Sequence, residues 1–419
     1  MLVQWHLETQ SKQFISRLGA PILNFSLSGP SQTYYSTLMA DNSVKVVRFD
    51  NNKVKVHIQG VQLDRVSLGG KETGFLAGSF VVPHKNTLQM YSVDDRTVDS
   101  LQVKPRNYVS SANQSESVSS TQVESYCFTP DKLTLVTFEE LRDANSHKDF
   151  RIQALKFWSR DTAQEGFQGF SVDWMLHDPC EDPETGVKLE AIDNQNIVIV
   201  NGSKIQVWGA ASASAEKKKW GVKAEFNYQG LKVVQIAPDV RYRLGATKQG
   251  TIVRALVFLH EHGILSFWNQ ETLEFLYSFK LNSTSKKVVF ESSMRYLASL
   301  TAEGSVEVWK TKGAQEKYWW DLSFRSVKDI INNPDKENQF IISMNSEDTQ
   351  EVESDSILLF QYSRPQNLIM YWKSQLPFLK LHFCSHAEDT SSYLLLVTKN
   401  LELQKIYFGV DRDDLKAIA

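Results

Sequence analysis

Cysteine is scarce in this chain of 419 residues, which contains only Cys127, Cys180 and Cys384. The three residues are far apart and form no Cys-x-x-Cys pair, so a disulfide scaffold and a zinc site of that type are not expected. No apolar run approaches the roughly 18 residues that a membrane-spanning helix needs. The first residues also lack the basic and apolar regions of a signal peptide. These absences predict an intracellular protein that works in a reducing compartment, away from membranes.

The chain also has no excess of basic over acidic residues. Lysine and arginine number 46 against 49 aspartates and glutamates, which gives a formal net charge of −3. This balance excludes a strongly basic coat for nucleic acid and leaves only local basic patches. Hydrophobic residues make up 42% and charged residues 23% of the chain, which is a globular composition.

A short pattern of apolar, polar, apolar and aromatic residues recurs along the chain. Because its period is two, it predicts a strand with one buried face. Clear copies end at Trp5, Trp158, Trp208, Trp268 and Trp309, and weaker copies end at Val47, Tyr91, Phe360 and Gln404. Many intervals are close to the ~40–45 residues of a four-stranded propeller blade.

The repeat predicts an all-β chain, folded over residues 1–419 as a single β-propeller of the WD-repeat type. The count of copies indicates about eight four-stranded blades, with seven as the alternative. We expect the N-terminal strand Gln13–Leu18 to close the ring by completing the blade that begins near Phe378, because closure removes exposed strand edges. The strand at Trp5 then has no blade of its own, so Met1 is expected to lie inside a longer chain.

Two segments interrupt the repeat and are predicted to be mobile loops. Residues 107–125 are rich in serine and residues 346–356 are acidic. Neither segment has enough apolar residues to offset the entropy of ordering.

The N-terminal sequence QWHLETQSKQFISRLGAPI resembles a segment, W-x-L-x-T-x-x-K-Q-F-L-P-R-L-G-x-P-I, of one WD-repeat family. That family is the tandem-propeller subunit of the UtpA (t-UTP) subcomplex of the small-subunit processome. Ile15 and Ser16 depart from the Leu and Pro of the family segment. The matching positions are Trp5, Leu7, Thr9, Lys12, Gln13, Phe14, Arg17, Leu18, Gly19, Pro21 and Ile22.

The resemblance implies that the chain is the second propeller of a longer tandem-propeller protein. It further implies a scaffold in the nucleolus, within the nucleus, that supports transcription and processing of precursor ribosomal RNA. The implied partners are other propeller subunits and the precursor RNA.

The WD signature itself is nearly absent, since the only Trp-Asp pair is Trp320–Asp321. The Asp–His–Ser–Trp hydrogen-bond network of orthodox WD repeats is therefore not expected.

No catalytic, cofactor-binding or metal-binding residues are predicted, so the chain is not expected to be an enzyme or to bind a small-molecule substrate. A G-x-S-x-G nucleophile elbow is absent from the sequence. His260 and His262 flank Glu261, but no third ligand is nearby in sequence. We interpret these histidines as solvated turn residues.

The densest basic run is Lys217, Lys218 and Lys219, followed by Trp220. Lysines can contact phosphates and an aromatic ring can stack on a base, so this segment is the best candidate for RNA contact. Weaker candidates are Lys286–Lys287 and the group Lys45, Lys53 and Lys55. The other Trp and Phe residues are interpreted as core.

The favoured function is a non-catalytic scaffold in early small-subunit assembly, making protein–protein and RNA contacts. One alternative is a propeller adaptor in an unrelated complex, and the segment from Trp5 to Ile22 argues against it. The other is a hydrolase-type propeller with a site in its central channel. That alternative needs repeated His or Asp residues on the inner strands, which the sequence does not show.

Overall fold

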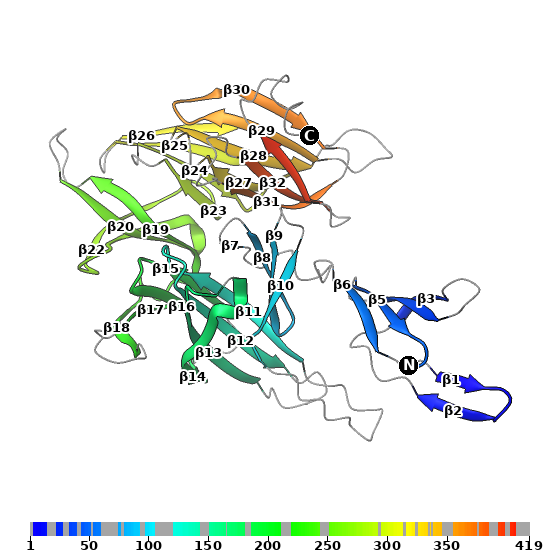
Figure 1. Cartoon of the computed structure of the whole chain (residues 1–419). Coiled ribbons are helices and arrows are strands. Elements are labelled where there is room, and N and C mark those ends of the chain that lie inside the picture. The colour runs from blue at the N-terminus through cyan, green and yellow to red at the C-terminus, as the bar shows by residue number, and fades with distance from the viewer. Residues whose placement is uncertain are drawn as a thin grey trace.

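The structure is a computed structural model in which the regular secondary structure of the described residues is almost entirely antiparallel β-strand (Figure 1). It describes residues 3–14, 22–27, 33–39, 43–51, 53–59, 74–76, 79–92, 97–104, 120–142, 151–164, 166–180, 186–210, 219–243, 251–291, 295–312, 316–322, 326–333, 336, 338–345, 355–374, 377–384, 393–398 and 403–407. None of the helices in these ranges is long and apolar enough to cross a membrane.

The described strands form seven four-stranded sheets, one three-stranded sheet and one two-stranded hairpin, with strands paired in sequence order. The first half of the chain contains β1 (Val3–His6), β2 (Ser11–Phe14), β3 (Ile22–Leu27), β4 (Tyr34–Met39), β5 (Ser43–Arg48), β6 (Val54–Gln59), β7 (Gly74–Leu76), β8 (Ser79–His84), β9 (Thr87–Ser92), β10 (Val98–Gln102), β11 (Ser120–Phe128), β12 (Thr134–Arg142), β13 (Arg151–Arg160), η1 (Gly166–Gly169), β14 (Phe170–His177), β15 (Val187–Ala191), β16 (Asn196–Asn201), β17 (Lys204–Ala210) and β18 (Trp220–Phe226).

The second half continues the same order of strands. It contains β19 (Val233–Arg243), β20 (Ile252–His260), η2 (Glu261–Gly263), β21 (Ile264–Asn269), β22 (Phe275–Lys280), β23 (Ser285–Phe290), β24 (Tyr296–Thr301), β25 (Val306–Lys312), β26 (Glu316–Leu322), β27 (Val327–Asn332), β28 (Gln339–Asn345), β29 (Asp355–Gln361), β30 (Arg364–Lys373), β31 (Phe378–Cys384), β32 (Tyr393–Thr398) and β33 (Leu403–Tyr407).

The recurring strand pattern correctly locates the third strand of each sheet. Eight of its nine copies, from Val47 to Gln404, lie in β5, β9, β13, β17, β21, β25, β29 and β33, each of which is the third strand of its sheet. The ninth copy, at Trp5, lies in the hairpin β1–β2, where the indole is 56% exposed. The third-strand prediction holds because alternation is a local property of a half-buried strand.

The first strands of successive sheets contact one another from β11 through β15, β19, β23 and β27 to β31. The sheets therefore face each other, and the hydrophobic core is divided into layers between neighbouring sheets. One layer joins Phe138 and Phe157 to Leu189 and Trp208 of the next sheet. Similar layers join each following pair of sheets. In Figure 1 the sheet β3–β6 and the hairpin β1–β2 stand apart from the other sheets.

Among the described residues the expected closure by the N-terminal strand Gln13–Leu18 is not seen, and residues 15–18 of that strand lie outside the described part of the chain. Strand β2 pairs with β1, with Val3 opposite Phe14, and the sheet β31–β33 contains three described strands. A hairpin with a short turn costs little chain entropy, whereas pairing across almost the whole chain costs more. Local pairing therefore occupies the strand that was expected to close the ring.

Both predicted loops extend too far at their C-terminal ends. Ser120–Ser125 form the first part of β11, and Asp355 and Ser356 open β29. Asp355 is buried, and its carboxylate accepts hydrogen bonds from Lys328 and from the amide of Phe378, which offset the cost of burying the charge. The remaining residues of the two segments lie outside the described part of the chain.

Candidate interaction surfaces

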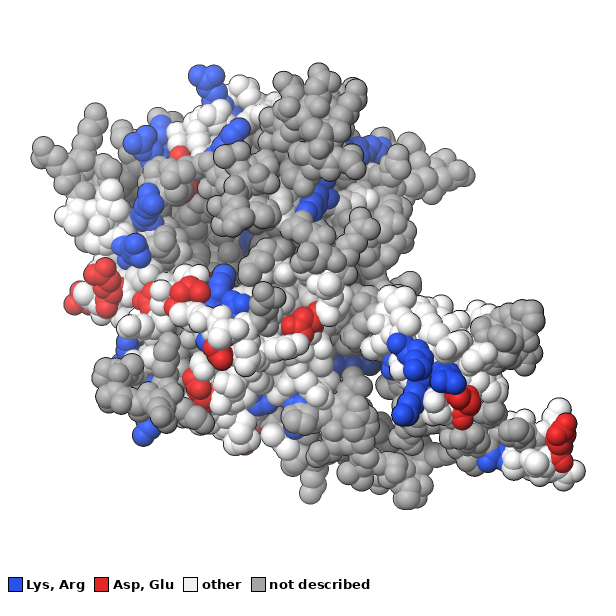
Figure 2. Space-filling model, viewed as in Figure 1, with Lys and Arg blue, Asp and Glu red and all other residues white. Residues whose placement is uncertain are grey.

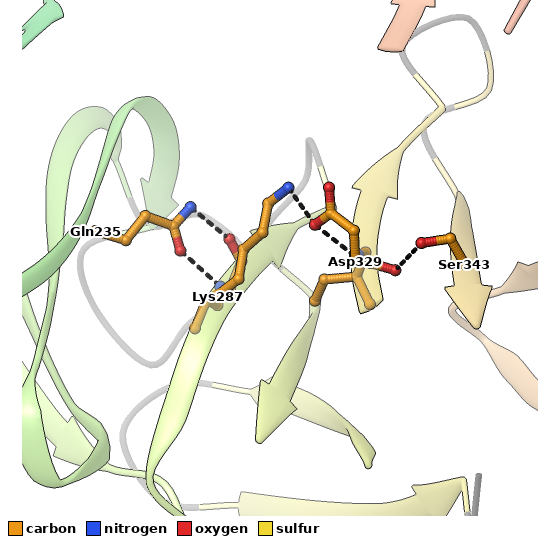
Figure 3. Close-up of polar contacts among 6 residues, drawn as sticks. Gln235, Lys287, Asp329 and Ser343 are labelled. Carbon is orange, nitrogen blue, oxygen red and sulfur yellow. Dashed lines mark hydrogen bonds and ion pairs between the residues drawn. The ribbon is translucent and has the colours of Figure 1, made fainter. Parts of the chain in front are cut away.

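Side chains on the first strands connect each sheet to the next, as Figure 3 shows for three sheets. The amide of Gln235 on β19 donates to the carbonyl of Val288 at 3.0 Å and accepts from its N–H at 2.6 Å. One residue before Val288, the ammonium of Lys287 lies 2.7 Å from a carboxylate oxygen of Asp329 on β27. The hydroxyl of Ser343 donates to the Asp329 carbonyl within that sheet. Each link satisfies inner polar groups and ties neighbouring sheets together.

The same kind of link joins β15 to β19, and a second one joins β23 to β27. Lys188 on β15 donates to the Val233 carbonyl at 2.8 Å. Asn332 donates to the Phe290 carbonyl at 2.6 Å and accepts from the Tyr362 hydroxyl. Burial is the main reason that the pKa of Tyr362 is raised well above its ordinary value, so this hydroxyl keeps its proton at neutral pH. These contacts tie neighbouring sheets together through side chains.

A buried ion pair lies within the sheet β11–β14, and its lysine also contacts the residue that follows β10 of the preceding sheet. The ammonium of Lys156 on β13 lies 2.8 Å from one oxygen of Glu139 on β12 and donates to the carbonyl of Val103, beyond β10, at 2.6 Å. Burial raises the pKa of Glu139, opposed by the hydrogen bond from Lys156. The lysine thus compensates a carboxylate that would otherwise be costly to bury.

A histidine–serine–tryptophan network occurs where none was expected. His260 is fully buried, with Nε2 2.7 Å from the hydroxyl of Ser266, and the indole N–H of Trp268 donates to the same hydroxyl at 3.0 Å. The prediction of a solvated His260 was wrong because β20 continues through it and places its ring under Tyr228. His262, two residues later, is exposed as predicted.

The hydrogen bonds of this network fit a neutral imidazole. Ser266 accepts from Trp268, so its own proton is free to be donated to Nε2 of His260, with the ring proton on Nδ1 facing the Leu231 carbonyl at 3.4 Å. Burial lowers the pKa of His260, opposed by the hydrogen bond to Leu231 and by the charge of Glu261.

We expect His260 to make the fold sensitive to mild acid. Because its pKa is lower in the folded chain than the ordinary value of 6.5, the unfolded chain binds the proton first, and stability present above that pH is lost as the pH falls through it. Urea unfolding at pH 7.5 and 5.5 should show a larger loss for the wild type than for His260→Gln. An equal loss in the two proteins would contradict the assignment.

The segment predicted to contact RNA contains a core residue. Trp220 is only 5% exposed, and its ring stacks on Phe157 with centroids 4.6 Å apart. It therefore cannot stack on a base, because strand β18 turns it into the layer between two sheets. Lys219 is exposed, and Lys217 and Lys218 lie outside the described residues.

The segment that carries the family resemblance is only partly described. The ammonium of Lys12 lies 4.3 Å from the centre of the Trp5 ring, and both residues are exposed on the hairpin β1–β2. In the backbone pairing Gln13 and Phe14 lie opposite Gln4 and Val3. Arg17, Leu18, Gly19 and Pro21 lie outside the described residues.

Basic side chains gather on the sheet β3–β6. Lys45 and Arg48 lie on β5, Lys55 lies on β6, and Lys53 directly precedes β6. Figure 2 shows this group as a blue cluster on the part of the molecule that stands apart. We call these four residues the basic patch. The sequence analysis treated Lys45, Lys53 and Lys55 as weaker candidates for RNA contact than Lys217–Trp220. Their spacing along the chain does not show that they lie close together in the fold.

A cavity of about 420 Å³ lies at the first strands of four sheets, β15, β19, β23 and β27. Its charged lining residues are Glu190, Arg241 and Glu291, and Asn332 lines another side. Among the described lining residues there is no histidine, cysteine or serine. The described part of the chain also holds no group of three or more residues placed to bind a metal ion.

The comparisons with known proteins agree with the sequence resemblance. No protein-family model matches the chain. A curated relative, "U3 small nucleolar RNA-associated protein 17" of Schizosaccharomyces pombe, is 23% identical over 312 residues. The match covers 65% of this chain and 37% of the relative, so the chain spans well under half of that protein. The resemblance predicted from the N-terminal segment is therefore confirmed.

A solved structure, "Crystal structure of Chaetomium thermophilum Raptor", matches 79% of this chain and 27% of its own chain with a TM-score of 0.50. At 10% identity this likeness concerns the fold alone. It agrees with an all-β chain of repeated antiparallel sheets.

Proposed function

We propose that this chain is a non-catalytic scaffold domain in early assembly of the small ribosomal subunit. The observation that carries the proposal is the similarity to a protein named for its association with the U3 small nucleolar RNA. Sheets tied together by polar links support a rigid surface for assembly rather than a reaction centre. The domain would act in the nucleolus, bound to other propeller subunits and to precursor ribosomal RNA, and would support transcription and processing of that RNA.

The proposal includes a closed propeller of about eight blades, with seven as the alternative, as one domain of a longer tandem-propeller protein. Support comes from the sheet β3–β6, where Leu23 is 67% and Ile58 60% exposed. Apolar side chains of this size favour packing on another sheet. The sheet β31–β33 is the natural neighbour because it ends the row of contacting first strands. An experimental structure with β3–β6 packed elsewhere would refute closure.

A pull-down of the tagged full-length protein from growing cells tests the function. Proteins and RNA that co-purify should be identified together, and we expect propeller subunits and precursor ribosomal RNA. Recovery of coat or signalling proteins without ribosomal precursors would instead favour the generic adaptor. Hydrolytic activity that is lost on substituting Glu190 or Glu291 in the cavity would favour the hydrolase.

A further inference from the structure

Most fourth strands of the sheets have a bulge that interrupts their pairing with the third strand. A strand at the edge of a sheet has a row of unpaired N–H and C=O groups that can pair with another chain, and bulges reduce this tendency. Five of the seven described fourth strands contain such a bulge. The bulged residues are Lys55 of β6, Asp173 of β14, Lys223 of β18, Leu276 of β22 and Ile369 of β30.

The two remaining fourth strands, β10 and β26, pair without interruption. The short helix η1 lies against β10, where the N–H of Phe167 donates to the carboxylate of Asp99 at 2.7 Å. Strand β26 pairs with β25 along all seven of its residues with no shift of register. Strand β30 of the next sheet comes near β26 without pairing with it. Among the described fourth strands, β26 alone has neither a bulge nor an element bonded to it from outside its sheet.

The end of β26 carries a charge that its own sheet does not balance. Asp321 is exposed and lies directly opposite Glu307 of β25, so two acidic residues share one face of the sheet. Like charges in opposite positions of neighbouring strands are destabilising. Glu307 is only 3% exposed and accepts a hydrogen bond from the hydroxyl of Ser283 at 2.6 Å. A cation placed beside Asp321 from outside the chain would relieve this repulsion.

The sequence of β26, EKYWWDL, is complementary to itself in an antiparallel pair. When two copies are aligned about Trp319, Lys317 of each copy lies opposite Asp321 of the other. The same alignment puts Tyr318 opposite Trp320 and Trp319 opposite its own counterpart. Opposite charges and aromatic residues in opposite positions stabilise antiparallel strands. A register moved by one residue in either direction loses both pairs of opposite charges.

We propose that β26 pairs edge to edge with β26 of a second copy of this chain, antiparallel and centred on Trp319. The two four-stranded sheets then form one continuous sheet across a two-fold axis. Because each copy uses the same strand, the interface is satisfied by two chains and does not extend into a filament. This inference does not rest on the proposed role in ribosome assembly. Closure of the ring through β3–β6 and β31–β33 leaves β26 at the outer rim.

The expected dimer is weak and sensitive to salt. Seven residues from each copy are far fewer than the roughly 20–30 residues per partner of a standard stable interface. The fraction of dimer should therefore rise with protein concentration, as mass action requires. High salt should lower it, because exposed ion pairs are screened. Sedimentation velocity of the purified full chain measures both effects.

Reversal of one charge in each pair tests the register. Lys317→Asp and Asp321→Lys each convert two opposite-charge pairs into two like-charge pairs. Each variant alone should therefore raise the dissociation constant of the dimer about tenfold or more. A mixture of the two variants should dimerise nearly as well as the wild type. In the mixed dimer the introduced aspartate of one chain lies opposite the introduced lysine of the other, and the native pair remains at the second position.

The matched control is Lys280→Asp, which makes the same change of charge at an exposed lysine of β22, a fourth strand with a bulge. This variant should dimerise like the wild type. Circular dichroism checks that every variant folds, and a fluorophore on one of the two charge variants identifies the mixed dimer.

Three results would overturn the proposal. The first is a wild-type chain that stays monomeric at every concentration. The second is a mixture of Lys317→Asp and Asp321→Lys that dimerises no better than either variant alone. The third is an equal loss of dimer in Lys280→Asp, which would show that the overall charge, rather than the edge of β26, governs association.

Discussion

Replacement of Lys156 by Met is expected to destabilise the fold by about 3–5 kcal/mol, since it leaves the Glu139 carboxylate buried without its counter-charge. Glu139 is only 2% exposed, so water cannot replace the lost partner. The substitution also removes the hydrogen bond from Lys156 to the Val103 carbonyl, which joins two sheets. Urea unfolding at pH 7 measures the loss.

The double variant Lys156→Met/Glu139→Leu is the matched control. Replacing a whole buried ion pair by apolar residues is often neutral or stabilising, so the double variant should recover most of the lost stability. The loss in Lys156→Met should also shrink at low pH. Because the pKa of Glu139 is raised in the folded chain, the contribution of this one carboxyl group to stability is greatest below the ordinary glutamate pKa of about 4.3 and is lost as the pH rises above it. A double variant as unstable as the single one would show that packing, not charge, causes the loss.

Replacement of Phe157 by Ala should cost about 3–5 kcal/mol, the range for removal of a large buried side chain. Its ring is fully buried and packs between two sheets, with the centroids of Trp174 and Trp220 at 5.3 and 4.6 Å. The cavity left behind would separate these indoles, so tryptophan fluorescence should change together with the unfolding midpoint.

Phe157→Leu retains most of the volume and should cost clearly less than Phe157→Ala. The surface control Leu368→Ala, at a residue 47% exposed, should stay within about 0.5 kcal/mol. If Phe157→Ala were no more harmful than Leu368→Ala, the layer between these sheets would not be a tightly packed core.

The location of the strands could be predicted from the sequence because the signal lies within a few residues. Alternation at LKFW, IQVW and VEVW placed Trp158, Trp208 and Trp309 on third strands, where all three are buried. The same reasoning failed at Trp220, which opens the fourth strand of its sheet. Because Trp220 follows three lysines, the sequence predicted an exposed ring. Nothing in the local sequence shows which neighbouring sheet will cover a strand.

The candidate sites depended on residues that are distant in the chain. His260 had no visible partner until strand pairing brought Ser266 and Trp268 to its ring. Lys45 and Lys55 are ten residues apart in sequence, and they come close only because β5 pairs with β6. Burial and local charge are sums over such neighbours, so periodicity could not reveal them.

The sequence by itself determined the all-β class, the third strands and the resemblance to a small-subunit assembly protein, because each depends on residues adjacent along the chain. Tertiary structure alone decided which polar groups are buried and how the sheets are joined. Gln235 and Val288, like Lys156 and Val103, are 53 residues apart in sequence. Only packing of one sheet against the next brings such groups within hydrogen-bonding distance, and no local pattern of residues specifies that contact.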